Sequence, residues 1–194
     1  MEARRHRTAV LAYAVVFIIC VLWTGAAVLT PVFEAGVVSK ATTMAKQDGG
    51  LLGWMGLAAL RGMYHFVCHQ IPERSFWIDG RPMAVCARCF GIYSGCLLGL
   101  LIYPLSSRFA EVENPPRVWL ILSLVPVGVD FLGGYLGVFQ NTDISRAITG
   151  LIAGSAAVFY VMPGLVATAA NIVLAVNSLW RTGRRSYVRA ATNI

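Results

Sequence analysis

The chain has 194 residues, of which 57% are hydrophobic and 13% are charged, with a formal net charge of +7. Soluble domains average roughly half apolar and a quarter charged residues, so this composition excludes an ordinary water-soluble domain and predicts a lipid environment. The positive charge does not indicate nucleic-acid binding, because it gathers at the chain ends as membrane-flanking charge does: Arg4, Arg5 and Arg7, then Arg181, Arg184, Arg185 and Arg189.

The first apolar run extends from Ala9 to Thr30. About 20 such residues, rising 1.5 Å each, cross a hydrocarbon core of roughly 30 Å, so the run predicts a transmembrane helix. A signal peptide is the alternative, but its apolar region is usually roughly 7 to 15 residues long, and Ala26-Ala27 is a weak cleavage site. We therefore expect an uncleaved helix here.

The next apolar segment, from Leu51 to Val67, carries Arg61 and His65. These polar side chains favour an interfacial or re-entrant helix over a full crossing of the bilayer. A second span is expected over Phe90 to Tyr103, beginning near Val85 so that Cys86 and Cys89 form its first turns. Its small residues suit close helix packing: Gly91, Ser94, Gly95 and Gly99.

Two further spans complete the predicted bundle. The third runs from Val118 to about Phe139, after the breaker Pro115-Pro116, and contains one ionisable residue, Asp130. The fourth, from Ala147 to about Trp180, is longer than a straight span and has Pro163-Gly164 near its middle. It is therefore either one kinked helix or two short pieces.

The fold class expected from these elements is an all-α polytopic membrane bundle of four spans and one interfacial or re-entrant helix. Basic residues at both ends place both termini in the cytoplasm, which requires an even number of crossings. We divide the chain into an N-terminal helix with its outer linker (1–50), a membrane core (51–180) and a basic cytoplasmic tail (181–194). In this topology the segments 31–84 and 141–146 both lie on the outer face.

A cluster of cysteines and a histidine dominates the polar sequence: Cys68-His69 and the pair Cys86-x-x-Cys89. A Cys-x-x-Cys pair places two sulfurs about one helical turn apart, close enough to bridge each other or to hold one soft metal ion. Cys68 and His69 raise the ligand number to the four that a closed zinc site requires. Adjacent residues rarely bind one ion, so the alternative is one ligand and one supporting residue.

Three interpretations of this cluster stay open: a site for zinc or another thiophilic metal, a dithiol/disulfide redox pair, and structural cysteines without further chemistry. A covalent c-type haem is not expected, because Phe90 stands where that motif needs His. Cys20 and Cys96 fall within apolar runs, where a cysteine behaves as a small buried hydrophobic residue.

Charged and polar residues near the cluster are the candidates for catalysis or ligand binding. Asp130 is costly inside a span unless it is paired, and we expect Arg146 to be its partner. The residues from Asn141 to Ser145 are alternatively an N-cap turn for the last helix. Basic groups beside thiolates lower thiol pKa values and also bind anionic head groups. The candidates are Arg74, Arg88, Asp130, Asn141 and Arg146, with Gln70 and Tyr93 as supporting groups.

The sequence resembles a family of small prokaryotic membrane proteins known as domain of unknown function 2085. The resemblance covers roughly Tyr64 to Ala157, and Phe90 departs from the Thr expected in the family pattern. It implies one site shared by the cysteine cluster and the segment 141–146, and it supplies no reaction. The matching pieces are Cys68-His69-Gln70, Pro72-Glu73-Arg74-Ser75-Phe76, Cys86-Ala87-Arg88-Cys89, Gly91-Ile92-Tyr93, Gly95, Asp130, Asn141, Arg146, Thr149 and Gly150.

The leading functional hypothesis is a membrane protein in which Cys68, His69, Cys86 and Cys89 bind zinc or another thiophilic metal and shape a polar pocket at the extracytoplasmic face. The first alternative is a membrane enzyme, either a thiol oxidoreductase that uses a quinone or an enzyme that modifies an isoprenoid or phospholipid. The second is a non-catalytic accessory subunit. The expected partners are the bilayer, a lipid or quinone ligand, and another membrane protein or a second copy, but no nucleic acid.

Overall fold

The computed structural model describes residues 2–43, 49–106 and 115–192, and these ranges are mostly helical. The predicted all-α membrane bundle is confirmed. A 3-10 turn, Pro72–Arg74, and two short strands, β1 and β2, lie between the second and third helices. The helices are α1 (Glu2–Thr43), α2 (Gly49–His65), α3 (Ala87–Ser106), α4 (Arg117–Tyr135) and α5 (Asp143–Thr192), and the strands are β1 (Trp77–Ile78) and β2 (Arg81–Pro82).

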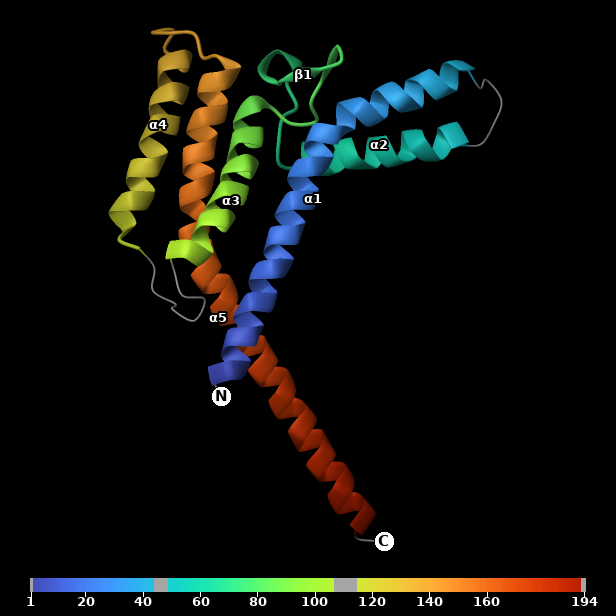
Figure 1. Ribbon diagram of the computed structural model, residues 1–194, viewed down its shortest axis with the longest axis vertical. Helices are drawn as coiled ribbons and strands as arrows, with labels where there is room; N and C mark the ends of the chain where they lie inside the picture. Colours follow the sequence, from blue (N-terminus) through green and yellow to red (C-terminus); the bar gives the residue numbers. More distant parts are fainter. Residues whose placement is uncertain (1, 44–48, 107–114, 193–194) are drawn as a thin grey trace.

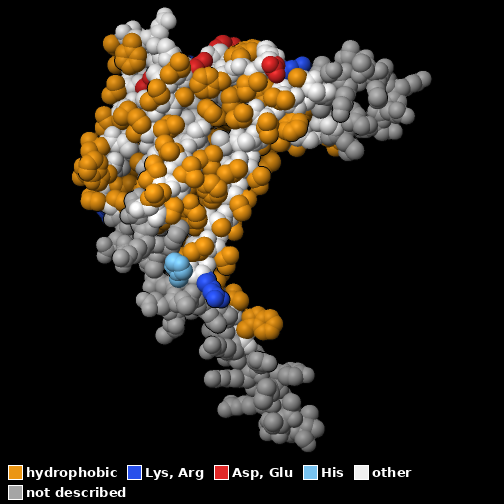
Figure 2. Space-filling view, in the orientation of Figure 1, with side chains coloured by type: hydrophobic (Ala, Val, Ile, Leu, Met, Phe, Trp, Pro, Cys, Tyr) orange, Lys and Arg blue, Asp and Glu red, His pale blue; other side chains and the backbone are white. Residues whose placement is uncertain are grey.

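Four of these helices are long and apolar enough to cross a membrane: His6–Gly36, Ala87–Leu105, Arg117–Tyr135 and Asp143–Val173. They correspond to the four predicted spans, although the third helix ends at Tyr135, before the expected Phe139. The fourth is one helix that continues past Pro163, so a division into two pieces is wrong. Hydrophobic side chains cover the flank of the bundle in Figure 2, as lipid contact requires.

The helix α2 does not run parallel to the four long helices of the bundle. Figure 1 shows α2 projecting sideways from the upper part of the bundle, beside the upper part of α1, which bends in the same direction away from the bundle axis. Pro31 lies inside α1, and a proline inside a helix removes a backbone hydrogen bond and bends the helix. An ion pair between Arg61 and Glu34 joins α2 to α1. This placement agrees with the interfacial helix expected from the sequence.

A seam of glycines holds α3 against α5. Gly91, Gly95 and Gly99 face successive turns of α5, and a Cβ atom at Gly91 or Gly95 would overlap the α5 backbone. In return, Gly150 and Gly154 lie against the α3 carbonyls of Arg88 and Ile92. Because the contacting residue numbers rise together on both helices, α3 and α5 run parallel. Small residues allow this close backbone approach, and the resulting van der Waals packing helps to hold helices together in lipid.

The first span packs against the C-terminal half of α3 and against the middle of α5. Ala9 lies in a buried cluster with Tyr103 of α3 and Met162 of α5. The Tyr13 hydroxyl donates a hydrogen bond of 2.7 Å to the Leu100 carbonyl. Because residues early in α1 meet residues late in α3, the two helices are antiparallel. The N-terminus of α1 therefore lies at the end of the bundle opposite to the start of α3, as Figure 1 shows.

Candidate metal centre

A structured loop brings Cys68, three residues after the end of α2, back to Cys86, the residue before α3. Its tip is the hairpin of β1 and β2, in which Asp79 and Gly80 adopt φ angles of 50° and 73°. Two positive φ angles in an Asp-Gly pair are those of a type I′ turn, which matches the twist of a two-stranded hairpin. After the hairpin, residues 83–85 are buried, and they direct the chain to the first cysteine of the pair.

Three cysteine sulfurs converge at this point. The Sγ atoms of Cys68, Cys86 and Cys89 all lie within 4.8 Å of one another, and all three thiols are free. The distance between the Sγ atoms of Cys86 and Cys89 is 3.5 Å. A disulfide requires about 2.05 Å, whereas two thiolates at about 2.3 Å from one tetrahedral zinc ion are about 3.8 Å apart. The sulfurs are thus separated nearly as ligands of one ion would be.

Backbone amides support the sulfurs. The Cys86 N–H donates to the Cys68 Sγ at 3.2 Å, so the two ends of the loop are already bonded to each other. Cys86 itself immediately precedes α3, where helix N–H groups without partners favour negative charge. Hydrogen bonds from the Cys68 and Cys89 thiols lower the pKa of the Cys86 thiol, and the backbone N–H groups of Cys89 and Arg88 lower it further. The arrangement therefore suits at least one thiolate.

The wall around the sulfurs is apolar. Cys68 is 4% exposed and belongs to a buried cluster with Ala27, Tyr64 and Val85. The Tyr64 hydroxyl donates to the Trp23 carbonyl on α1, and burial raises the pKa of Tyr64, so this side chain is a neutral hydrogen-bond donor. Tyr93, a supporting residue in the sequence analysis, also packs against this cluster.

The two residues after Cys68 are placed differently. The His69 side chain is exposed, and among the described His, Cys, Asp and Glu residues only Cys68, Cys86 and Cys89 form a group close enough to hold one ion. Gln70 has a positive φ of 53°, and its side-chain amide donates to the Arg61 carbonyl at 2.8 Å. Gln70 therefore reverses the chain and fastens it to α2. The sequence did not reveal this separation of His69 from the sulfurs.

A second polar group lies beside the cysteines, where α3, α4 and α5 meet. Asp130 of α4 is 5% exposed and forms an ion pair with Arg88 of α3. The Ser145 hydroxyl donates to the other carboxylate oxygen at 2.8 Å, and the Asn141 side-chain amide donates to the backbone carbonyl of Asp130. A buried carboxylate in a span is costly unless it is paired and hydrogen-bonded, and both conditions are met here.

The expected pairing of Asp130 with Arg146 is wrong. Arg146 instead pairs with Asp143, three residues earlier on α5, at 3.3 Å. Because Arg88 stands in the first turn of α3, it reaches Asp130 from the neighbouring helix, a partner that the sequence order did not suggest. The N-cap interpretation also holds, since the Thr142 hydroxyl accepts the Ser145 N–H at 3.0 Å. Arg74 is exposed in the 3-10 turn and joins neither group within the described ranges.

A family model described as "Predicted membrane protein (DUF2085)" matches residues 68–160. An uncharacterized protein of Methanocaldococcus jannaschii is 45% identical over 104 residues, which are 54% of this chain and 67% of that protein. An uncharacterized protein of Methanothermobacter thermautotrophicus is 32% identical over 93 residues, 47% of this chain and 80% of that protein. The chain belongs to the DUF2085 family. No solved structure is significantly similar to it.

The DUF2085 match begins at Cys68 and ends at Tyr160, within α5. It contains all three clustered cysteines, the ion pair between Arg88 and Asp130, and the glycine seam, but neither α1 nor α2. The resemblance drawn from the sequence is therefore confirmed. The two polar groups described above both belong to the family region, while α1 and α2 supply much of the apolar wall around the sulfurs.

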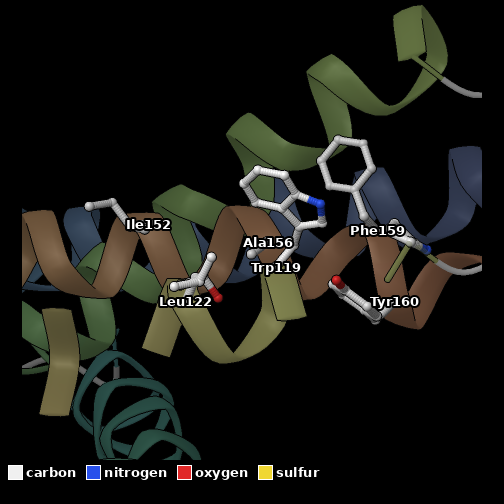
Figure 3. A pocket seen from close by; sticks show the side chains of 8 residues that line it. Trp119, Leu122, Ile152, Ala156, Phe159 and Tyr160 are labelled. Atoms are coloured by element: carbon white, nitrogen blue, oxygen red, sulfur yellow. The ribbon is translucent and has the colours of Figure 1, made fainter. Parts of the chain in front are cut away.

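A separate hollow of about 390 Å³ opens between α4 and α5, at the end of the bundle far from the cysteines. Figure 3 shows Trp119 and Leu122 of α4 facing Ile152, Ala156, Phe159 and Tyr160 of α5. The lining is almost wholly apolar, and the Tyr160 hydroxyl is engaged with the Pro116 carbonyl at 2.8 Å. The Ser123 hydroxyl is likewise bonded to a backbone carbonyl, that of Leu120, so this surface suits lipid chains in a bilayer.

Proposed function

We propose that this protein is an integral membrane protein whose three-cysteine cluster binds a thiophilic metal ion. One observation carries the proposal: the Sγ atoms of Cys68, Cys86 and Cys89 converge within 4.8 Å as free thiols, with Cys86 and Cys89 at 3.5 Å. That spacing is near the value of about 3.8 Å for ligands of a tetrahedral zinc ion. Soft thiolates select such ions over magnesium or calcium.

Such an ion would have a structural consequence. Cys68 follows α2, whereas Cys86 and Cys89 flank the start of α3, so a shared ion would bond the interfacial helix to the bundle. The hairpin loop between them would then be closed at its base. Because metal ligands are not assembled in an unfolded chain, the binding free energy would add to the stability of the folded state.

The test is metal analysis of the purified, reduced, full-length protein in detergent. We expect about one equivalent of a thiophilic metal per chain, and we expect Cys68→Ser, Cys86→Ser and Cys89→Ser each to abolish most of it. The matched control is the double variant Cys20→Ser, Cys96→Ser, because these cysteines lie in a different packed cluster of the same membrane core. The control should retain the full metal content.

A metal-free protein in which all five cysteines react equally with an alkylating reagent would contradict the proposal. The closest rival is a redox function, favoured by the free Cys86 and Cys89 thiols one helical turn apart. In that case two thiols would pass two electrons and two protons to a quinone and form a disulfide. A reversible disulfide between Cys86 and Cys89, trapped in intact cells, would support this rival.

The charge pattern gives less support to an enzyme that binds lipid head groups. Arg88 and Arg146, two of the candidate cations, are both neutralised by aspartates, so neither offers an unpaired charge to a phosphate. Arg74 is the remaining candidate from the sequence. Arg74→Ala should therefore leave co-purified phospholipid unchanged if the cluster is a metal centre alone.

A further inference from the structure

The cysteine cluster offers three candidate ligands, all of them sulfurs. Among the described residues, no His, Cys, Asp or Glu side chain joins the three sulfurs, and His69 is exposed. A zinc ion would need a further ligand to complete its tetrahedron. A water molecule in that position needs two to four polar partners, yet the neighbouring wall consists mainly of apolar groups such as Ala27 and Val85. The geometry thus favours an ion that is satisfied by three sulfurs.

Charge leads to the same expectation. Three thiolates carry a charge of −3. The complex therefore has a net charge of −2 with a monovalent ion, −1 with a divalent ion and zero with a trivalent ion. The nearest arginine in the sequence, Arg88, directs its guanidinium to Asp130, whose carboxylate offsets its charge. Net charge is costly to bury in an apolar site, so a neutral complex is favoured.

We propose that the occupant of the cluster is a trivalent thiophilic element of the arsenic group, bound as arsenite or antimonite is by thiols. This inference rests on the proposed function, since it names the ion for the same three cysteines. Arsenic(III) forms a pyramidal complex with three sulfurs, and its lone pair fills the fourth position, so neither water nor a fourth residue is required.

The binding reaction is a ligand exchange without a redox change. Arsenous acid, As(OH)₃, meets the thiols of Cys68, Cys86 and Cys89. Three As–O bonds break and three As–S bonds form, and each thiol proton leaves with one hydroxide as water. The product is a neutral trithiolate and three water molecules. The apolar wall then protects the As–S bonds from hydrolysis.

The experiment titrates sodium arsenite into the reduced full-length protein in detergent. The readouts are the near-ultraviolet sulfur-to-arsenic absorption and the number of thiols that remain alkylatable. We expect one arsenic per chain and the loss of three reactive thiols, with arsenite displacing zinc when both are present. Replacing one cysteine leaves a dithiol, so Cys68→Ser should weaken binding by more than the roughly 10–100-fold typical of losing an outer-shell partner.

Two controls separate the three-sulfur site from other binding. The double variant Cys20→Ser, Cys96→Ser should bind arsenite as the unmodified protein does, because these cysteines lie outside the cluster. His69→Ala should also leave arsenite binding unchanged, whereas it would weaken zinc binding if the exposed imidazole turned inward to complete a tetrahedron. Thiol counting on the unmodified protein is informative even if a serine variant fails to fold.

The failure of this inference differs from the failure of the proposed function. One zinc per chain together with arsenite binding no tighter than in Cys68→Ser would overturn the arsenic assignment and leave a zinc site. If neither ion protects the three thiols from alkylation, both the assignment and the proposed function are wrong. Protection of three thiols by arsenite, with zinc displaced, supports both.

Discussion

At the scale of single residues, Arg88 has the most unusual position. It stands between Cys86 and Cys89 in the sequence, yet its guanidinium reaches Asp130 on α4 while the two sulfurs meet Cys68. The first turn of α3 thus contributes side chains to two polar groups, the cysteine cluster and the ion pair with Asp130. The buried carboxylate of Asp130 depends on Arg88 and on the Ser145 hydroxyl to offset the loss of hydration.

Asp130→Asn should destabilise the protein by about 2–4 kcal/mol, because it leaves the partly buried Arg88 charge without its counter-ion. The double variant Arg88→Met, Asp130→Leu should recover most of this loss, since it removes both charges. The measurement is the free energy of unfolding in mixed detergent micelles.

Asp143→Asn is the matched control, because the Asp143 carboxylate is more exposed than that of Asp130 and its partner lies on the same helix. Asp143→Asn should lower the free energy of unfolding by less than about 1 kcal/mol. Equal costs for Asp130→Asn and Asp143→Asn would show that burial of the first pair does not matter.

Residue types and spacing predicted the cysteine cluster well, but not its partners. Cys-x-x-Cys has a local geometry, so Cys86 and Cys89 could be paired from spacing alone. The distance from Asp130 to Arg88 depends instead on which spans are neighbours, and sequence order favoured Arg146, which is nearer along the chain. The exposure of His69 depends on the backbone reversal at Gln70, which has no strong sequence signal.

At the scale of elements, the glycine seam fixes α3 against α5. Gly95→Ala should destabilise the bundle by about 1–3 kcal/mol, because the added methyl group would overlap the Leu151 backbone and force the helices apart. Gly128→Ala, in α4, is the control, since its Cβ would meet no atom within 4 Å. Alanine also favours helix over glycine by roughly 1 kcal/mol, so the control should be neutral or stabilising.

The measurement is the free energy of unfolding of both variants in detergent micelles. Equal stability of Gly95→Ala and Gly128→Ala would contradict close packing at the seam. The small residues of α3 indicated a close contact from the sequence, but not the identity of the helix that makes it. For α3 and α5 to pack in parallel, α4 must return the chain to the end of the bundle that holds the cysteines. The order of the spans does not by itself say that α3 and α5 are neighbours.

At the scale of the whole molecule, four spans bring the start of α1 and the end of α5 to the same end of the bundle, as Figure 1 shows. The arginines near both termini favour the cytoplasm for that end, which would place the cysteines outside.

Reporter domains fused to either terminus should both be active only as cytoplasmic fusions, and a membrane-impermeant reagent should label a cysteine introduced at Asp79 from outside. The hairpin position suits this label because Asp79 is exposed. Labelling of this cysteine only after permeabilisation would contradict this orientation and would place the three cysteines on the cytoplasmic side.

The short sequence interval between the three cysteines also affects biogenesis. All three sulfurs lie between residues 68 and 89, before α4 and α5 begin. All three cysteines of the proposed site therefore leave the ribosome while the C-terminal half is still being synthesised. Ion capture would then fasten α2 to the start of α3 early, and the later helices would insert beside a unit whose outer loop is already closed.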